Sequence, residues 1–290
     1  MVKVTSILII LVSLLYGLQG KAQMVINVIN PEEILKSDPI DNVLFTAQYQ
    51  TSFVPDASNP EKRKEETMML KVGNKASVYY SYAKFLTDSV IEEDKKNGVS
   101  QEVMIEHLQQ FSGVINYKIY KNYPSRKITT LEPIAASRFK CVEENERPNW
   151  QLKSDTMTIL SYHCQKAVCH FKGRDYEAWF TPEIPRSEGP WKLQGLPGLI
   201  LRAKDSKEHY IFDCIGITQN KTDDTIQYSD HGHEPVSRKN LNKLQERFAA
   251  DPVGYIASTN PHVKVTIMDN SGRPTKNPKD TPYNPIELED

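Results

Sequence analysis

The amino-acid sequence predicts an α+β fold that is mainly β: a curved antiparallel sheet, or an open half-barrel meander, with two or three helices. Three observations lead to this prediction. Segments rich in β-branched and aromatic residues, such as residues 43–54, recur along the chain and are separated by short polar turns. Helical spacing is confined to residues 83–111 and 237–250. The 290 residues also include 18 Pro and 14 Tyr, a composition that disfavours a long helical bundle.

The first 22 residues predict a secretory signal peptide. Lys3 provides a positive start, residues 4–18 are apolar and uncharged, and Gly20 and Ala22 place small residues before a cleavage site. This apolar run is short for a membrane span, which needs about 20 residues. We therefore expect cleavage after Ala22, export to the periplasm or beyond the cell, and no transmembrane segment in the mature chain. An uncleaved N-terminal anchor is the alternative.

The expected strands follow one another as hairpins. Residues 66–72 and 75–82 flank Gly73-Asn74, a dipeptide typical of a hairpin turn. A polar turn at residues 172–175 precedes a strand at 176–181. The other strands are expected at residues 117–120, 127–131, 156–171, 199–203 and 209–217. We expect the long strand to be broken near its middle, at Ser161.

Two helical regions interrupt the strands. Ser237 is a candidate N-cap for a helix over residues 237–250, and Asp251-Pro252 should end that helix. A second helix is expected near residues 101–111 with Ser100 as its N-cap, and a weaker helical stretch precedes it.

The mature chain is expected to form a single domain over residues 23–268, followed by an extended Pro-rich tail over residues 269–290. Ile286 and Leu288 of this tail could add as an edge strand to an envelope or outer-membrane protein. Lys+Arg total 36 and Asp+Glu total 37, so the net charge is −1. That balance predicts no nucleic-acid partner, because such partners require a clustered basic excess.

The most distinctive pattern lies between residues 162 and 200. It contains Tyr-His-Cys-Gln-Lys-Ala, then Phe-Lys-Gly-Arg, then Ala-Trp-Phe-Thr-Pro-Glu-Ile-Pro, and it ends in Gly-Leu-Pro-Gly-Leu-Ile at residues 195–200. With Tyr-Asn-Pro-Ile-Glu-Leu at residues 283–288, these segments closely resemble the GLPGLI family over essentially the whole mature chain. The members of that family are secreted envelope proteins of Gram-negative bacteria. The resemblance implies export but no reaction, because the family has no agreed biochemical activity.

The Gly-Leu-Pro-Gly-Leu-Ile motif has a simple structural interpretation. Leu196, Pro197 and Gly198 are typical of a type II turn, in which Pro fixes φ and the following Gly supplies a positive φ. Gly195 would let the backbone approach a neighbouring segment closely. The motif is then a packed turn that sets the register of the next strand.

The alternative places function at this motif. A groove for a ligand or partner would be lined by Trp179, Trp191 and the turn, with Arg174 at a nearby hairpin tip. A hydrolase with its site near these three residues is a further alternative. The sequence contains no G-x-S-x-G elbow, no H-E-x-x-H, no P-loop and no dinucleotide fingerprint, so no catalytic motif selects a reaction.

Four cysteines in an exported protein predict two disulfides. On one regular strand, Cys164 and Cys169 would point to opposite faces and lie about 16 Å apart, too far for a bond. Cys169 and Cys214 both lie on apolar faces of their strands. We therefore expect the pair Cys169–Cys214, and Cys141–Cys164 follows by elimination.

The loop Asp-His-Gly-His-Glu at residues 230–234 is the best candidate for metal ligands. The single Gly between His231 and His233 lets both rings turn toward one ion, and imidazole suits Cu(II) or Zn(II). A structural site normally uses about four ligands, so other residues or a second chain must supply the rest. A solvated loop without metal is the alternative.

These observations favour an exported, non-catalytic binding protein, and copper or zinc binding in envelope metal homeostasis is its most concrete form. An envelope accessory protein that acts with an outer-membrane partner through the tail is the first alternative. A peptidase-like hydrolase is the second.

Overall fold

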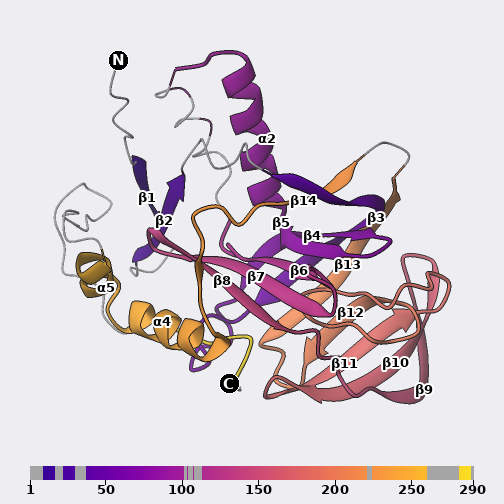
Figure 1. The fold of residues 1–290 in the computed structure, drawn as a ribbon. Coiled ribbons are helices and arrows are strands. Elements are labelled where there is room, and N and C mark those ends of the chain that lie inside the picture. Colours follow the sequence, from indigo (N-terminus) through magenta and orange to yellow (C-terminus); the bar gives the residue numbers. More distant parts are fainter. Residues whose placement is uncertain are drawn as a thin grey trace.

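The computed structural model describes residues 9–16, 22–29, 37–100, 113–220, 224–259 and 281–288, together with Val103 and His107. Within these residues the chain is mostly β, with three helices (Figure 1). Strands β1 (Ile9–Tyr16) and β2 (Ala22–Ile29) form a separate antiparallel hairpin. Strand β1 lies within the predicted signal peptide, whose cleavage stays a prediction.

The remaining strands form one sheet. Its strands are β3 (Asp38–Phe53), β4 (Lys64–Gly73), β5 (Ser77–Ser81), β6 (Lys118–Lys121), β7 (Lys127–Ile134), β8 (Ser137–Glu144), β9 (Gln151–Ile159), β10 (Tyr162–Phe171), β11 (Arg174–Thr181), β12 (Leu199–Asp205), β13 (Tyr210–Gln219), β14 (Thr225–Tyr228) and β15 (Glu234–Pro235).

The order of the sheet is β15-β8-β7-β6-β5-β4-β3-β13-β12-β11-β10-β9, and β14 pairs with β3 beside this path. Neighbours are antiparallel except that β15 runs parallel to β8. Among the described residues the two ends of the path, β15 and β9, do not pair, so the sheet is not closed into a barrel. The predicted α+β fold that is mainly β is therefore confirmed at this level.

The strand boundaries follow the predicted pattern closely. The hairpin at Gly73-Asn74 is present, and the backbone N of Gly73 donates to the carbonyl of Ala76 at 2.9 Å. The long strand predicted at residues 156–171 is two strands, and Leu160 and Ser161 between them adopt positive φ values of 49° and 71°. Strands β1, β2, β8, β14 and β15 and the first half of β9 were not predicted.

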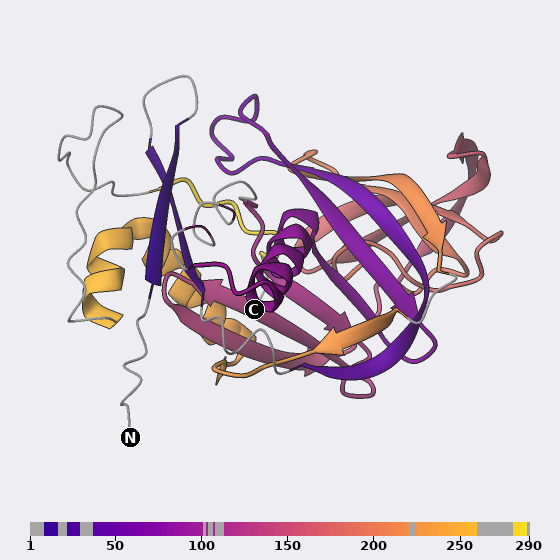
Figure 2. The same ribbon diagram turned by 90° about the horizontal axis from the view of Figure 1, so that it is seen from above.

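Two helices pack on this sheet, and a third packs beside one of them (Figure 2). Helix α2 (Tyr82–Lys96) packs on β4 and β5, and helix α4 (Arg238–Ala250) packs on β7 and β8. Helix α5 (Pro252–Thr259) packs against α4. None of the described helices is long and apolar enough to cross a membrane.

The helix ends agree with the predicted caps. The Ser237 hydroxyl accepts a hydrogen bond from the backbone N of Asn240 at 3.3 Å, as an N-cap should. The chain leaves α4 at Asp251, and Pro252 begins α5, a position that proline tolerates well. The helix predicted at residues 101–111 lies outside the described residues except for Val103 and His107, which are helical.

The main core lies on the face of the sheet that also receives the Gly-Leu-Pro-Gly-Leu-Ile motif. Tyr49, Phe212 and Leu201 are fully buried there. The hydroxyl of Tyr49 donates to the carbonyl of Ile200 at 2.7 Å, which ties β3 directly to the end of the motif. The core thereby fixes the position of the motif and of the segment that leads into it.

Strand β10 departs from regular alternation. Its pairing with β9 shifts register between Gln165, which pairs with Thr156, and Ala167, which pairs with Leu152. Cys164 and Cys169 are both buried in the main core, with 1% and 7% of their surface exposed, although opposite faces were expected for them.

All four cysteines are buried and carry free thiols, so neither predicted disulfide is present in the structure. Strands β11 and β12 separate Cys169 from Cys214, and at about 4.8 Å per strand this exceeds the reach of a disulfide along the sheet. Cys141 lies in a different cluster, beneath α4, from Cys164. Burial raises the pKa of Cys169 and of Cys214 to about 12, which keeps the reactive thiolate scarce at neutral pH.

Candidate ligand-binding site

The motif at residues 195–200 is a packed bend and not a type II turn. Gly195 has a φ of +99°, whereas Gly198 does not adopt a positive φ. Gly198 is required for space, because a Cβ there would lie 2.6 Å from the carbonyl carbon of Thr181 and closer still to its oxygen. The roles predicted for the two glycines are therefore exchanged: Gly195 supplies the unusual backbone conformation and Gly198 the close approach.

The apolar residues of the motif enter the core. Leu196, Leu199 and Ile200 are at most 1% exposed, and only Pro197 faces solvent. The backbone N of Leu199 donates to the carbonyl of Ile184 at 3.0 Å. The motif itself is thus packed structure, and the functional surface lies beside it.

The three residues predicted around a groove do not share one site. Trp191 is 1% exposed, and its ring contacts those of Phe171 and Tyr176 at centroid distances of 5.8 and 6.1 Å. Trp179 is half-buried on β11, where its ring lies 5.7 Å from the ammonium of Lys166. Trp191 borders a cavity beneath the C-terminal segment, and Trp179 does not.

Arg174 anchors the C-terminal segment to the domain. Its side chain is 3% exposed, and Nη1 contacts Oδ2 of Asp205 at 2.7 Å. Nε donates to the carbonyl of Ile286 at 2.9 Å, and Nη2 donates to the carbonyl of Pro285 at 2.6 Å. Nη2 also donates to Oδ1 of Asn284 at 2.9 Å. The guanidinium is therefore committed to holding backbone and side chain of residues 284–286.

We call residues 281–288 the strap. Besides Arg174, the Tyr210 hydroxyl donates to the carbonyl of Asn284 at 2.6 Å, and the backbone N of Leu288 donates to the carbonyl of Lys172 at 3.0 Å. Ile286 packs against the main core and Leu288 is 54% exposed. The described part of the predicted tail is thus extended but firmly docked, and Ile286 is not free to pair with a partner. Residues 269–280 lie outside the described residues.

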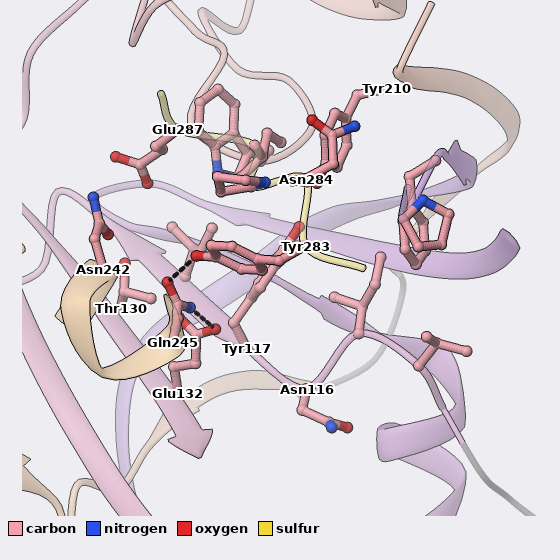
Figure 3. Close-up of a pocket in the computed structure, with 18 of the residues that line it drawn as sticks. Asn116, Tyr117, Thr130, Glu132, Tyr210, Asn242, Gln245, Tyr283, Asn284 and Glu287 are labelled. Atoms are coloured by element: carbon pink, nitrogen blue, oxygen red, sulfur yellow. Dashed lines mark hydrogen bonds between the residues drawn. The ribbon is translucent and has the colours of Figure 1, made fainter. Parts of the chain in front are cut away.

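A cavity of about 320 Å³ lies beneath the strap (Figure 3). Strands β3, β6 and β7, helix α4, residues 114–117, Trp191-Lys192 and the strap form its walls. The aromatic lining residues are Phe53, Tyr117, Trp191, Tyr210 and Tyr283, and the amide-bearing ones are Asn116, Asn242, Gln245 and Asn284. This size and mixture of aromatic and polar groups are typical of a site for a small organic ligand.

A buried ionic cluster borders the cavity, and three of its four members, Lys192, Arg238 and Glu287, line it. Lys192 Nζ lies 2.7 Å from Glu143 Oε2 and 2.6 Å from Glu287 Oε1. Arg238 Nη2 also contacts Glu143 Oε2, at 2.7 Å. The four side chains are between 2% and 16% exposed, so their charges interact with little screening. The cluster links the segment before the motif to β8, α4 and the strap.

The cluster predicts a stability loss in acid. Burial alone would raise the pKa of Glu143, but Lys192 and Arg238 lower it to about 2. Because the pKa is depressed in the folded state, the stabilisation is present above the unfolded pKa and is lost as the pH falls from about 4.5 to about 2. We expect this carboxylate to contribute about 3 kcal/mol to that loss. Urea unfolding of wild type and Glu143→Gln across this pH range measures this loss. If the free energy of unfolding changed equally with pH in both proteins, the prediction would be contradicted.

A second group of polar side chains crosses the cavity. The Tyr283 hydroxyl donates to Gln245 Oε1 at 3.0 Å, and Gln245 Nε2 donates to Glu132 Oε1 at 2.5 Å (Figure 3). Burial raises the pKa of Glu132, although nearby Arg238 opposes the shift. The Oε2 atom of Glu287 is buried and receives no hydrogen bond from the described residues. These groups provide donors and acceptors to a bound molecule.

Of the cavity-lining residues, Trp191 was predicted as a groove residue, whereas the charged and amide-bearing ones of the cavity wall were not. Lys192 stands between Trp191 and Leu193, so a charge inside an apolar run was the signal for a buried ion pair. Glu287 lies within the C-terminal segment that carries the family resemblance. No sequence pattern indicated that Glu132 and Gln245 would meet, because only the packing of α4 on β7 brings them together.

The metal-ligand candidates lie in a surface loop away from the cavity lining. His231 is exposed, and His233 Nδ1 lies 3.1 Å from the carbonyl of His231. The carboxylate of Asp230 contacts Lys140 Nζ at 2.6 Å and the Tyr228 hydroxyl at 3.0 Å. No group of three or more His, Cys, Asp or Glu side chains suited to a metal occurs in the described part of the chain. Copper or zinc binding stays a prediction.

Comparisons with known proteins bear on the family and not on the site. The model of a protein family of unknown function, Porph_ging, matches residues 170–202, which is consistent with the resemblance carried by the Gly-Leu-Pro-Gly-Leu-Ile motif. No curated protein matched the sequence. Two solved structures of PNGF-II, in the P21 and C2 space groups, are 14% and 15% identical to this chain, with TM-scores of 0.45 and 0.44. They cover 69% and 68% of this chain, which spans 32% and 31% of theirs.

The fold and the site together define a mostly β protein with an open sheet and a strap-covered cavity. The matched family has no assigned function, so a function for this chain has to be inferred from the chemistry of its cavity.

Proposed function

We propose that this chain is a non-catalytic binding protein whose cavity holds a small organic ligand. The observation that supports the proposal is the cavity of about 320 Å³ whose aromatic walls carry converging polar groups. One of them, Glu287 Oε2, is buried without a hydrogen-bond donor among the described residues, and such atoms normally have one. A ligand would supply it.

The groups of the predicted hydrolase site support binding over hydrolysis. Arg174 is committed to Asp205 and the strap, Trp179 packs on β11, and Trp191 is buried against aromatic rings. The same proposal includes a location outside the cytoplasm, in the periplasm or beyond the cell, and its support is the predicted signal peptide over residues 1–22. An envelope partner would then contact surfaces other than the buried part of the strap.

Filling the cavity should abolish ligand binding. Asn242 of α4 lines the cavity, and Asn242→Trp would place an indole ring in it. We expect compounds from a small-molecule library to raise the thermal midpoint of the wild type, because a ligand bound only to the folded state stabilises it, and not to raise that of Asn242→Trp. Asn240→Trp is the matched control, because Asn240 is exposed on the same helix. Equal shifts in Asn242→Trp and wild type would place the site elsewhere.

The surface loop supports a second proposal, a Cu(II) or Zn(II) site that serves metal handling in the envelope. Its support is the spacing of His231 and His233 and the exposure of His231. Titration should show saturable binding near one ion per chain, lost in His231→Ala/His233→Ala. Replacing His163 and His170, two exposed histidines of β10, should leave the binding unchanged. Retained stoichiometric binding in the first double variant would end this proposal.

A further inference from the structure

The charges around the cavity are unequal in number. The two cations Lys192 and Arg238 interact electrostatically with three carboxyl groups, those of Glu132, Glu143 and Glu287. Both cations contact Glu143 directly, and Lys192 also contacts Glu287. Glu143 does not line the cavity itself, but the buried cluster of these five side chains has one more acid than base.

The other titratable groups that face this set do not supply the missing charge. Tyr117, Tyr210 and Tyr283 line the cavity, and burial raises the pKa of each phenol, so all three are neutral near pH 7. Lys172 is near Glu143 and Glu287 but forms its own ion pair with Glu146 at 2.9 Å. Glu132 receives its short hydrogen bond from Gln245, a neutral amide.

One carboxylate oxygen at the cavity wall, Oε2 of Glu287, also lacks a hydrogen-bond donor among the described residues. Glu287 is 7% exposed, and its Oε2 atom receives no hydrogen bond from the described residues. Arg238 Nε lies 3.7 Å from this atom, which is beyond hydrogen-bond distance. A ligand that carries N–H donors would satisfy this oxygen.

The aromatic lining suits a cation as well. Lys192 already lies 6.0 Å from the ring of Trp191, and Arg174 lies 5.0 Å from the ring of Tyr210. Tyr117 and Tyr283 lie beside the Gln245–Glu132 pair (Figure 3). An ammonium group between these rings and the carboxyls would gain cation–π and charge-assisted interactions together.

We propose that the cavity binds a small monocationic primary amine, whose ammonium group balances the extra carboxyl and donates to Glu132 and Glu287. The proposal rests on the proposed function, because it names the ligand class of the same cavity. A primary amine fits better than a quaternary one, because the unused oxygen of Glu287 needs an N–H donor. A single charge fits because the excess is one carboxyl.

Calorimetry with n-butylammonium, n-butanol and butyrate as probes tests the ligand class. We expect saturable binding of n-butylammonium with one site per chain, and at least about tenfold weaker binding of the neutral and anionic analogues. Glu132→Gln keeps the shape and the amide-like contact to Gln245 but removes the ionisable group. We expect it to weaken n-butylammonium binding about tenfold or more. Glu144→Gln, on the exposed face of β8, is the matched control and should bind like the wild type.

Measuring proton release on binding tests whether Glu132 interacts directly with the bound cation or only supports the fold. Burial raises the pKa of Glu132, and a cation bound beside the carboxylate should lower this pKa again, so binding at a pH near the pKa of Glu132 releases protons. Affinity should therefore rise with pH as Glu132 ionises. Calorimetry in two buffers of different ionisation enthalpy should show release of up to about one proton in wild type and none in Glu132→Gln. Proton release that persists in Glu132→Gln would overturn the assignment.

The outcomes distinguish this inference from the proposed function. If n-butanol or butyrate binds as well as n-butylammonium, and Asn242→Trp blocks that binding, the ligand class is wrong and the cavity is still the binding site. If n-butylammonium binds wild type and Asn242→Trp equally, both the ligand class and the cavity proposal fail. Binding that Asn242→Trp and Glu132→Gln both weaken supports both.

Discussion

Replacing Arg174 with Ala should destabilise the fold by about 3–5 kcal/mol, because the change leaves a buried carboxylate without its cation. Asp205 is 2% exposed and loses its contact with Nη1 at 2.7 Å. The carbonyls of Pro285 and Ile286 lose their donors at the same time. The guanidinium is 3% exposed, so the groups that lose it are shielded from bulk solvent in the folded protein.

Urea unfolding at neutral pH measures this loss, and hydrogen exchange of the strap localises it. The amide of Leu288, which donates to Lys172, should exchange faster in the variant because the strap detaches. Arg202→Ala is the matched control: Arg202 and its partner Asp213 are 39% and 45% exposed, so that pair should contribute less than about 1 kcal/mol. Equal losses for the two variants would show that the strap does not depend on Arg174.

Replacing Gly198 with Ala should cost about 3 kcal/mol or more, since the methyl group has no space. Its Cβ would lie 2.6 Å from the carbonyl carbon of Thr181 and 3.0 Å from the backbone N of Pro182. Both neighbours are backbone, which cannot move away as the end of a flexible side chain can. The bend must shift, and Leu199 and Ile200 would be pulled from the core with it.

Thermal and urea unfolding compare this variant with Gly216→Ala. Gly216 also lies on a sheet strand, but the nearest atom to its Cβ position is Gln48 Oε1 at 4.0 Å. That control should change stability by no more than about 1 kcal/mol. A Gly198→Ala protein as stable as wild type would mean that the bend has a conformation with more space than the structure shows.

Local pattern was enough for most of the fold. Alternation and turn residues predicted strands such as β3, β4 and β13, because each strand repeats its side chains every two residues and each hairpin needs permissive turn residues. Ser237 likewise predicted the start of α4, because an N-cap bonds within its own first turn.

The wrong predictions concern residues whose environment depends on a neighbouring strand and not on local sequence alone. Cys164 and Cys169 are both buried in one core, near an irregularity in the pairing of β10 with β9, and the alternation of a single strand does not include that pairing. The exchange of roles between Gly195 and Gly198 has a similar origin. Whether a glycine is needed for its φ or for space depends on Thr181, a residue of another strand.

The sequence by itself determined the mainly β fold, its helix caps and the segments that carry the family resemblance, because these depend on interactions within a few residues. Only the tertiary structure decided the site. Arg174 meets the strap across more than 100 positions of sequence, and Glu132 meets Gln245 across a similar interval. Charge balance and unsatisfied oxygens are properties of such long-range contacts, since a buried charge is stabilised by whichever partner the fold brings to it.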